Sequence, residues 1–304
     1  MYNAMISPSP SSGPVLASFA STHTPEWLRS AANLPEMGVE YDAAGRVLWQ
    51  IMRPQGKPSI TRGLLRDALI VMDAVAAAPK TAEGHPVAYM VLASGVPGVY
   101  NLGGDLALFR QLIVERNAAA LTTYAHTCIE VQYRRATRLG LPMCTIALVQ
   151  GDALGGGFEA ALAHDVIVAE RSAKFGLPEI LFNLFPGMGA YTFLRRRLSP
   201  VMAERLMTSG RLYSAEELLD MGVIDMVAED GAGAEAVRAY IRAHRRAGKS
   251  RMAVTRARDI ANPVSHRELL EITDLWVETA LTLTSQDLRK MDHLVAAQKR
   301  RMAA

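Results

Sequence analysis

The chain has 304 residues, of which 50% are hydrophobic and 21% are charged, and its formal net charge is +3. This length and composition suffice for a large hydrophobic core and are typical of a globular protein rather than a disordered or fibrous one. No run of about 18 apolar residues is present to span a membrane, and the N-terminus lacks the pattern of a secretory signal, so we expect a cytoplasmic protein.

The first two thirds of the chain predict alternating strands and helices. Residues 1–25 are rich in Ser, Pro and Ala and are expected to form a flexible arm. A hairpin is expected at 38–52, followed by a helix that Ser59 or Thr61 caps. Buried strands are expected at 87–92, 143–149 and 166–169, and a long helical region is expected to end at Leu139. This repeated order indicates βαβ units and an α/β fold.

Beyond residue 187 the pattern is mostly helical. A single short strand is expected at 223–227. The apolar periodicity predicts helices at 188–197, 200–209, 214–221, 233–247, 251–260 and 265–299. We therefore expect a core over residues 26–230 and a helical C-terminal region over 231–304. Its apolar stripe, which includes Leu269 and Trp276, is expected to pack on the core or on a second subunit.

Two glycine turns and two glutamates are the strongest candidates for chemistry. Gly155–Gly157 separates a predicted strand from a helix that carries Glu159, and Glu179 follows 20 residues later in an apolar segment. A second glycine turn lies upstream at Gly103–Gly104. Backbone N–H groups at such turns can stabilise an oxyanion, and carboxylates with pKa values raised by burial can transfer protons.

Each of these features also has a purely structural interpretation. A glycine turn can simply join a strand to a helix, and either glutamate alone could cap a helix or form an ion pair. Two turns and two glutamates together favour function. The histidines and the two cysteines, Cys128 and Cys144, have no metal-ligand spacing. We therefore expect buried thiols, no metal and no cofactor.

Basic residues cluster at three places. They are Arg134, Arg135 and Arg138; Arg195–Arg197; and several residues of 242–251. Such clusters are often solvated helix faces. The alternative is a surface that receives phosphopantetheine or an acidic carrier protein. Neither interpretation involves nucleic acid.

Five segments together resemble the crotonase (enoyl-CoA hydratase/isomerase) superfamily over residues 40–300. They are Leu102–Leu106, Gly151–Glu159, Phe175–Glu179, Pro186–Gly189 and Tyr213–Glu217 with Gly222–Ile224. The resemblance implies a core of ββα units, a helical C-terminal region and assembly into trimers or paired trimers. It implies that the amides of Gly104 and Gly156 form the oxyanion hole and that Glu159 and Glu179 are the catalytic residues.

Within the superfamily, four segments resemble the diffusible signal factor synthases of bacterial quorum sensing: Leu177–Tyr191, Gly155–Leu162, Val99–Leu106 and Thr273–Ala280. That resemblance implies dehydration of a 3-hydroxyacyl thioester on acyl carrier protein and release of a cis-2-unsaturated fatty acid. It also leaves room for a regulatory signalling protein as a partner. The chain departs from ordinary hydratases at Ala190–Tyr191, where these usually have Gly-Thr, and at Phe158, where they have a smaller residue.

The same segments supply the expected substrate contacts. These are Leu102 and Gly103 at the first turn and Phe158, Leu177, Leu181, Phe185, Met188 and Tyr191 around an acyl tunnel. Two alternatives remain open at this point. One is an enoyl-CoA hydratase or isomerase that retains the thioester on coenzyme A, and the other is a catalytically silent member that binds a partner protein.

Overall fold

A six-stranded sheet forms the centre of the computed structural model, which describes residues 24–82 and 84–303. Its strands follow the order β1-β2-β3-β5-β7-β10. β1 (Met37–Asp42) pairs antiparallel with β2 (Val47–Met52), and all the other pairs are parallel. The remaining strands are β3 (Tyr89–Ser94), β5 (Cys144–Val149), β7 (Val166–Glu170) and β10 (Met226–Ala228).

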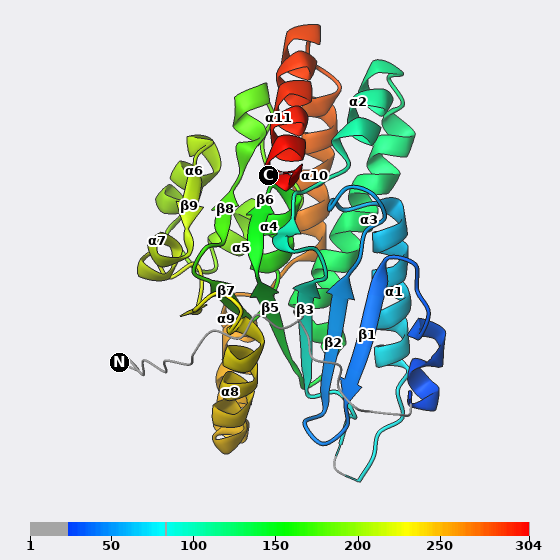
Figure 1. Cartoon of the computed structure of the whole chain (residues 1–304), viewed down its shortest axis with the longest axis vertical. Helices are drawn as coiled ribbons and strands as arrows, with labels where there is room; N and C mark the ends of the chain where they lie inside the picture. Colours follow the sequence, from blue (N-terminus) through cyan, green and yellow to red (C-terminus); the bar gives the residue numbers. More distant parts are fainter. Residues whose placement is uncertain (1–23, 83, 304) are drawn as a thin grey trace.

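A second sheet of four strands lies above β5 and β7 in Figure 1. It contains β4 (Gly98–Asn101), β6 (Gly151–Leu154), β8 (Lys174–Gly176) and the antiparallel β9 (Leu212–Ser214). Consecutive strands alternate between the sheets, because β3, β5 and β7 belong to the first and β4, β6 and β8 to the second. With the helix that follows each pair, this is the ββα repeat that the resemblance implied.

Helices pack on both faces of the six-stranded sheet. α1 (Arg62–Ala76) and α3 (Ala118–Ala136) cover one face, and α10 (His266–Ala280) packs along α3 (Figure 1). α8 (Gly233–Arg246) covers the other face, where it contacts β5 and β7, and its Val237 and Ile241 belong to the buried cluster on that face. Strands covered in this way are apolar on both sides, which explains why their sequences read as continuous hydrophobic runs.

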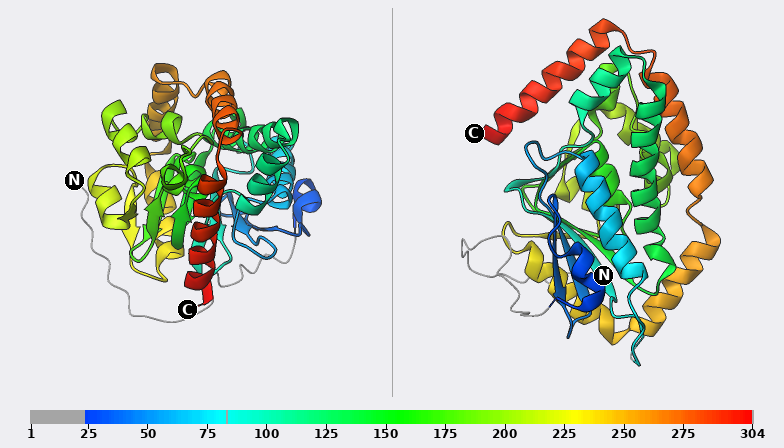
Figure 2. Two further views of the ribbon diagram at one scale, coloured as in Figure 1. Left: turned by 90° about the horizontal axis from the view of Figure 1, so that it is seen from above. Right: turned by 90° about the vertical axis from the view of Figure 1, so that its right-hand side faces the viewer.

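The smaller helices surround the second sheet. They are α2 (Leu106–Val114), α4 (Gly156–Leu162), the 3₁₀ helix η3 (Pro178–Phe182), α5 (Ala190–Leu194), α6 (Pro200–Ser209) and α7 (Ala215–Asp220). α9 (Gly248–Ala261) joins α8 to α10. α11 (Ser285–Ala303) diverges from α10 at one end of the molecule and returns toward α2 and η3 (Figure 2).

The predicted hairpin, the α1 helix with its Thr61 cap and the three buried strands are confirmed within two residues at each end. Other predicted elements differ. The strand expected at 223–227 begins only at Met226, as β10 (Met226–Ala228). The helical region before Leu139 breaks at Glu115–Asn117, where Asn117 caps α3, and the helix at 265–299 divides into α10 and α11. All four strands of the second sheet are additional to the prediction. The expected arm lies outside the described residues except for residues 24 and 25. No helix in the described ranges is long and apolar enough to cross a membrane.

Candidate active site

Two glycine turns meet at the ends of adjacent parallel strands. β4 leads to Gly103–Gly104 and β6 leads to Gly155–Gly156. A Cβ atom on Gly103 would lie 2.9 Å from the carbonyl oxygen of Leu154, and one on Gly156 would lie 3.4 Å from the amide nitrogen of Gly104. The φ angle of Gly103 is +96° and that of Gly155 is +50°, values that favour glycine. Glycine therefore permits the two turns to touch.

The amides of Gly104 and Gly156 line the same pocket. Gly156 is the first residue of α4, and the first N–H groups of a helix have no acceptor within the helix. In the turns and loops of the described residues, neither of the two N–H groups donates to a backbone carbonyl. Two amides without a backbone acceptor therefore lie in the wall of one pocket, as an oxyanion hole requires.

Glu159 is buried beside these amides. It lies in the first turn of α4 and is 1% exposed. Its Oε1 accepts hydrogen bonds from the backbone N–H of Met188 (2.8 Å) and of Ala190 (3.0 Å). Burial raises the pKa of Glu159 from the usual 4.5 to about 7, and the two N–H groups oppose that rise because they stabilise the charged form.

Glu179 faces the same pocket from η3. Its Oε2 is buried and has no hydrogen-bond partner among the described residues. Burial raises the pKa of Glu179 to about 8, and the negative charge of Glu159 adds to the rise. The residue as a whole is only partly buried, although its Oε2 atom is inaccessible to solvent. Two coupled carboxyls with raised pKa values can hold one proton between them near neutral pH.

An apolar pocket surrounds the glutamates and the glycine turns. It encloses about 640 Å³ of empty space, its open mouth included. Pro178, Glu179, Phe182 and Leu184 line one side, and Gly187, Met188, Trp276 and Leu294 line another. A mostly apolar pocket with a few convergent polar groups is the usual form of a small-molecule site.

Aromatic rings close the pocket beside the first glycine turn. Phe109 of α2 packs edge-on against Tyr124 of α3 (5.2 Å between ring centroids) and against Trp276 of α10 (5.1 Å). A Cβ atom on Gly104 would lie 2.5 Å from the Phe109 ring, so the ring also fixes the position of that turn. The Tyr124 hydroxyl donates a hydrogen bond to the carbonyl of Ile60, a further pocket residue.

Seven of the residues singled out from the sequence come together in this pocket: Leu102, Gly103, Gly104, Gly156, Glu159, Glu179 and Met188. The other five do not line it. Phe158 is fully buried against Phe175, Leu177 is buried in the core, and Phe185 packs on the core from outside. Leu181 is 46% exposed, and the Tyr191 hydroxyl donates to Glu204 on the surface.

The physical reason for this difference is the geometry of η3 and α4. η3 presents Phe182 to the pocket and turns Leu181 outward, and the same face of α4 cannot carry both Phe158 and Glu159. Sequence reasoning missed the pocket residues Ile60, Leu106, Phe109, Tyr124, Cys128, Phe182, Leu184 and Leu294. Most of them belong to α2, α3 and α11, which contact the glutamate segments in space but lie far from them in the sequence.

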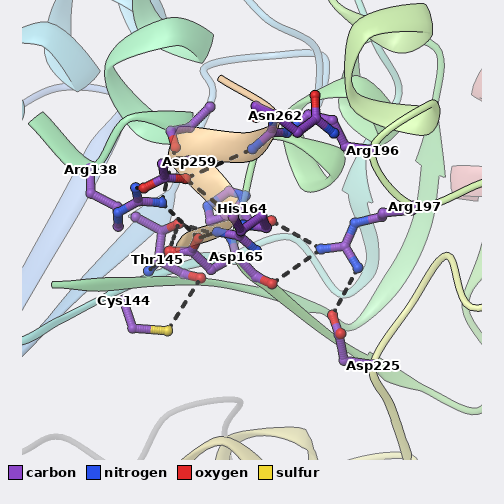
Figure 3. A network of polar contacts seen from close by, with 12 residues as sticks. Arg138, Cys144, Thr145, His164, Asp165, Arg196, Arg197, Asp225, Asp259 and Asn262 are labelled. Atoms are coloured by element: carbon purple, nitrogen blue, oxygen red, sulfur yellow. Dashed lines mark hydrogen bonds and ion pairs between the residues drawn. The ribbon is translucent and has the colours of Figure 1, made fainter. Parts of the chain in front are cut away.

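The basic clusters at 134–138 and 195–197 are mainly structural. Arg135 is buried and donates to Gln50 (3.0 Å). Arg138 bonds Asp165 (2.9 Å) and Asp259, and Arg197 pairs with Asp225 (3.1 Å), as Figure 3 shows. These residues tie α9 and the strand ends together, so most of them are neither solvated nor free to receive a carrier. No cluster of three or more His, Cys, Asp or Glu suited to a metal occurs in the described ranges.

The chain is similar in sequence to known proteins. Residues 47–300 match the family model for enoyl-CoA hydratase/isomerase. The mitochondrial methylglutaconyl-CoA hydratase of Rattus norvegicus is 32% identical over 191 residues, which cover 63% of this chain and 56% of that protein. The human counterpart is 31% identical over 63% of this chain and 52% of its own length, so the chain spans little more than half of these relatives.

Solved structures agree in fold. An enoyl-CoA hydratase from Bacillus halodurans superimposes with a TM-score of 0.72 at 21% identity, over 85% of this chain and 99% of that chain. DspI from Pseudomonas aeruginosa covers 94% of this chain and 98% of its own, with a TM-score of 0.57 at 19% identity. The mixed α/β architecture with a helical C-terminal region is therefore the crotonase fold.

Proposed function

Because the chain belongs to the enoyl-CoA hydratase/isomerase family, we propose that its pocket binds an acyl thioester and adds or removes water across the Cα–Cβ bond. The observation that carries this proposal is the pair Glu159 and Glu179, buried together beside the amides of Gly104 and Gly156. Carboxylates at the α- and β-carbons and amide donors at the carbonyl are the groups that this reaction needs.

The thioester carbonyl would accept hydrogen bonds from Gly104 and Gly156. Removal of the α-proton converts this carbonyl into an enolate, whose oxygen gains negative charge. Each preorganised N–H donor stabilises such an oxygen by about 3 kcal/mol in the transition state. The apolar walls strengthen the effect because they exclude water from the charged oxygen.

The surroundings of the two glutamates support the following assignment of roles. Two backbone N–H groups favour the charged form of Glu159, whereas Glu179 faces the charge of Glu159 and has an unpartnered Oε2. When the pair holds one proton, that proton lies on Glu179. In hydration, Glu159 accepts a proton from water, hydroxide adds to the β-carbon, and Glu179 donates its proton to the α-carbon. Dehydration is the reverse and starts with the shared proton on Glu159: Glu179 takes the α-proton, and Glu159 protonates the departing hydroxyl.

We further propose that the substrate is a 3-hydroxyacyl group on acyl carrier protein and that the product is a free cis-2-unsaturated fatty acid. Support comes from the resemblance of segments 99–106, 155–162, 177–191 and 273–280 to the diffusible signal factor synthases. After dehydration, a carboxylate can deprotonate a water that attacks the carbonyl carbon. The C–S bond then breaks, and the thiolate takes up a proton. No separate nucleophile is required, and a cytoplasmic location suits such a substrate.

A second candidate is a hydratase or isomerase that keeps its product on coenzyme A. The specific observation in its favour is the similarity to methylglutaconyl-CoA hydratases over 191 residues. It would use the same glutamates and amides without the hydrolytic step. A catalytically silent, partner-binding protein is less well supported, because both glutamates and both glycine turns line one pocket.

Product analysis separates these functions. Purified protein is incubated with 3-hydroxyacyl and 2-enoyl groups of several lengths, each on acyl carrier protein and on coenzyme A, and the products are measured by mass spectrometry. Free cis-2-unsaturated acid from the carrier-bound substrate supports the first candidate. Interconversion that leaves every acyl group on its thiol supports the second. No reaction with any substrate would refute both.

A further inference from the structure

The buried hydroxyl of Thr273 connects α10 to the turn that holds Glu159. Thr273 is fully buried, and its Oγ1 donates a hydrogen bond of 2.8 Å to the carbonyl oxygen of Gly187. That carbonyl belongs to the peptide unit whose N–H, on Met188, donates to Glu159 Oε1 at 2.8 Å. A hydroxyl, one peptide group and a carboxylate therefore form a continuous hydrogen-bonded chain.

The position of this peptide is fixed from α10 by two residues. Trp276 lies one helical turn beyond Thr273, and a Cβ atom on Gly187 would lie 2.4 Å from the Cβ atom of Trp276. The absence of a side chain on Gly187 lets α10 approach the turn closely enough for the hydroxyl to reach the carbonyl. The indole also forms part of the pocket wall. α10 thus contributes to the site both a wall and a polar contact.

We propose that Thr273 is a positioning residue for Glu159, acting through the Gly187–Met188 peptide. Donation to the carbonyl polarises the peptide and strengthens the hydrogen bond that its N–H makes to the carboxylate. Hydrogen bonds in such chains reinforce one another by on the order of 10–30% each. The bond also holds the 187–190 turn in the orientation in which Met188 and Ala190 both donate to the same oxygen.

Other groups around Glu159 do not replace this contact. Glu179 of η3 adds negative charge, and Cys128 of α3 is a neutral thiol whose pKa burial raises to about 12. Tyr124 of α3, also in the pocket wall, donates its hydroxyl to Ile60. Within the part of the chain that the structure describes, the backbone N–H groups of Met188 and Ala190 are the donors to the carboxylate, and Thr273 acts on the first of them.

The role of Thr273 in catalysis rests on the proposed function, but its effect on the pKa of Glu159 can be tested without turnover. In a Glu179→Gln background, Glu159 remains as the carboxyl of the pair, and infrared spectroscopy of its protonated C=O stretch as a function of pH gives its midpoint. Thr273→Val removes the hydroxyl and keeps the volume. The expected result is an upward shift of the Glu159 midpoint by a few tenths of a pH unit, with Thr273→Ser restoring the original value.

Thr192→Val is the matched control. Thr192 is also buried and links α5 to α10 through a hydrogen bond of 2.7 Å to Glu268, but it does not bond the peptide that donates to Glu159. An unchanged midpoint in Thr273→Val, or an equal shift in Thr192→Val, would overturn the proposal. If Thr273→Val does not fold, Thr273→Ala is read in the same way. In the active enzyme, the acidic limb of the pH profile of kcat/KM should shift in the same direction. The infrared result stands even if no substrate turns over.

Discussion

The Glu179 carboxylate occupies the space that a side chain on Gly155 would fill. A Cβ atom at position 155 would lie 2.6 Å from Glu179 Oε1, a separation too short for two non-bonded atoms. The backbone angles of Gly155 are φ +50° and ψ −126°. The turn that precedes the Gly156 amide and the carboxylate that faces it therefore occupy adjoining space. The absence of a side chain at position 155 thus serves both the proposed oxyanion hole and the position of the Glu179 carboxylate.

Gly155→Ala should consequently impair catalysis at two points. The methyl group displaces the Glu179 carboxylate, and the backbone angles are strained for any residue with a Cβ atom, at a cost of about 1–3 kcal/mol of stability. We expect kcat to fall at least about 100-fold, as for loss of a positioned proton donor. Steady-state kinetics and thermal unfolding measure the two effects.

Gly248→Ala is the control, because a Cβ atom there would meet nothing within 4 Å. It should leave kcat unchanged. Equal activity of Gly155→Ala and the wild-type protein would show that Glu179 does not need its present position.

Substitution of either glutamate by glutamine should remove proton transfer and keep the shape of the site. Glu159→Gln and Glu179→Gln should each lower turnover by about 10²–10⁴-fold. The effects should not add in the double variant, since both residues serve one reaction. Rates near the wild-type value in both single variants would refute the proposed mechanism.

The strands that carry the site were the ones that the sequence did not reveal. β2, β3, β5 and β7 each have five or six consecutive buried residues. In the sequence these segments are largely continuous apolar runs, and such runs predicted the strands. β4, β6, β8 and β9 have three or four residues each, and β4 and β6 both begin at a glycine. Such short segments have too few residues for a detectable alternation.

The residues that the sequence singled out as the candidate site lie in one pocket, although the sheet that supports them was not predicted. Glycine turns and carboxylates in apolar segments are local signals, and the resemblance to the crotonase superfamily then singled out Gly104 and Gly156 within the turns. The wall of the pocket depends on contacts between distant segments, such as that of Phe109 with Trp276. Apolar residues of this kind look the same in a sequence whether they line a pocket or fill a core.

The raised pKa values of the glutamates imply that stability decreases as pH rises. Between the usual value of 4.5 and about 7 for Glu159 and about 8 for Glu179, the folded protein binds more protons than the unfolded chain. The free energy of unfolding therefore falls through this interval. One pKa unit corresponds to about 1.4 kcal/mol, so the two rises together set an upper bound of about 8 kcal/mol on the loss.

Comparison with the double variant Glu159→Gln/Glu179→Gln isolates this effect. Buried His164, whose pKa is lowered well below its usual value by burial, titrates in an overlapping interval with the opposite sign and is common to both proteins. Urea unfolding at pH 5 and pH 9 should show a smaller loss of stability with pH in the variant. The same loss in both would mean that the glutamates are ordinary carboxylates in the folded protein.

The C-terminal region, residues 231–304, is expected to mediate assembly. None of the residues of α9 is buried, and Val254 and Ile260 are 69% and 83% exposed. Burial of these side chains against a second copy would be favourable. Light scattering at micromolar concentration should give a trimer or a pair of trimers, and Ile260→Asp should shift it toward a monomer. Val201→Asp, on the exposed face of α6, should have no effect. A monomeric wild-type protein would contradict this expectation.

Met188 and Leu181 distinguish the pocket wall from the surface beside it. Both residues were expected to line the acyl tunnel, but only Met188 borders the pocket, and Leu181 is turned outward on η3. Met188→Ala should enlarge the pocket and shift the preferred acyl group toward longer chains, since each additional buried methylene contributes about 0.8 kcal/mol. The proton chemistry should persist, because Glu159 is held by the backbone N–H of residue 188 and not by its side chain.

Leu181→Ala should leave the chain-length profile unchanged. A profile that moves with Leu181 and not with Met188 would place the acyl chain along the outer face of η3 and not in this pocket.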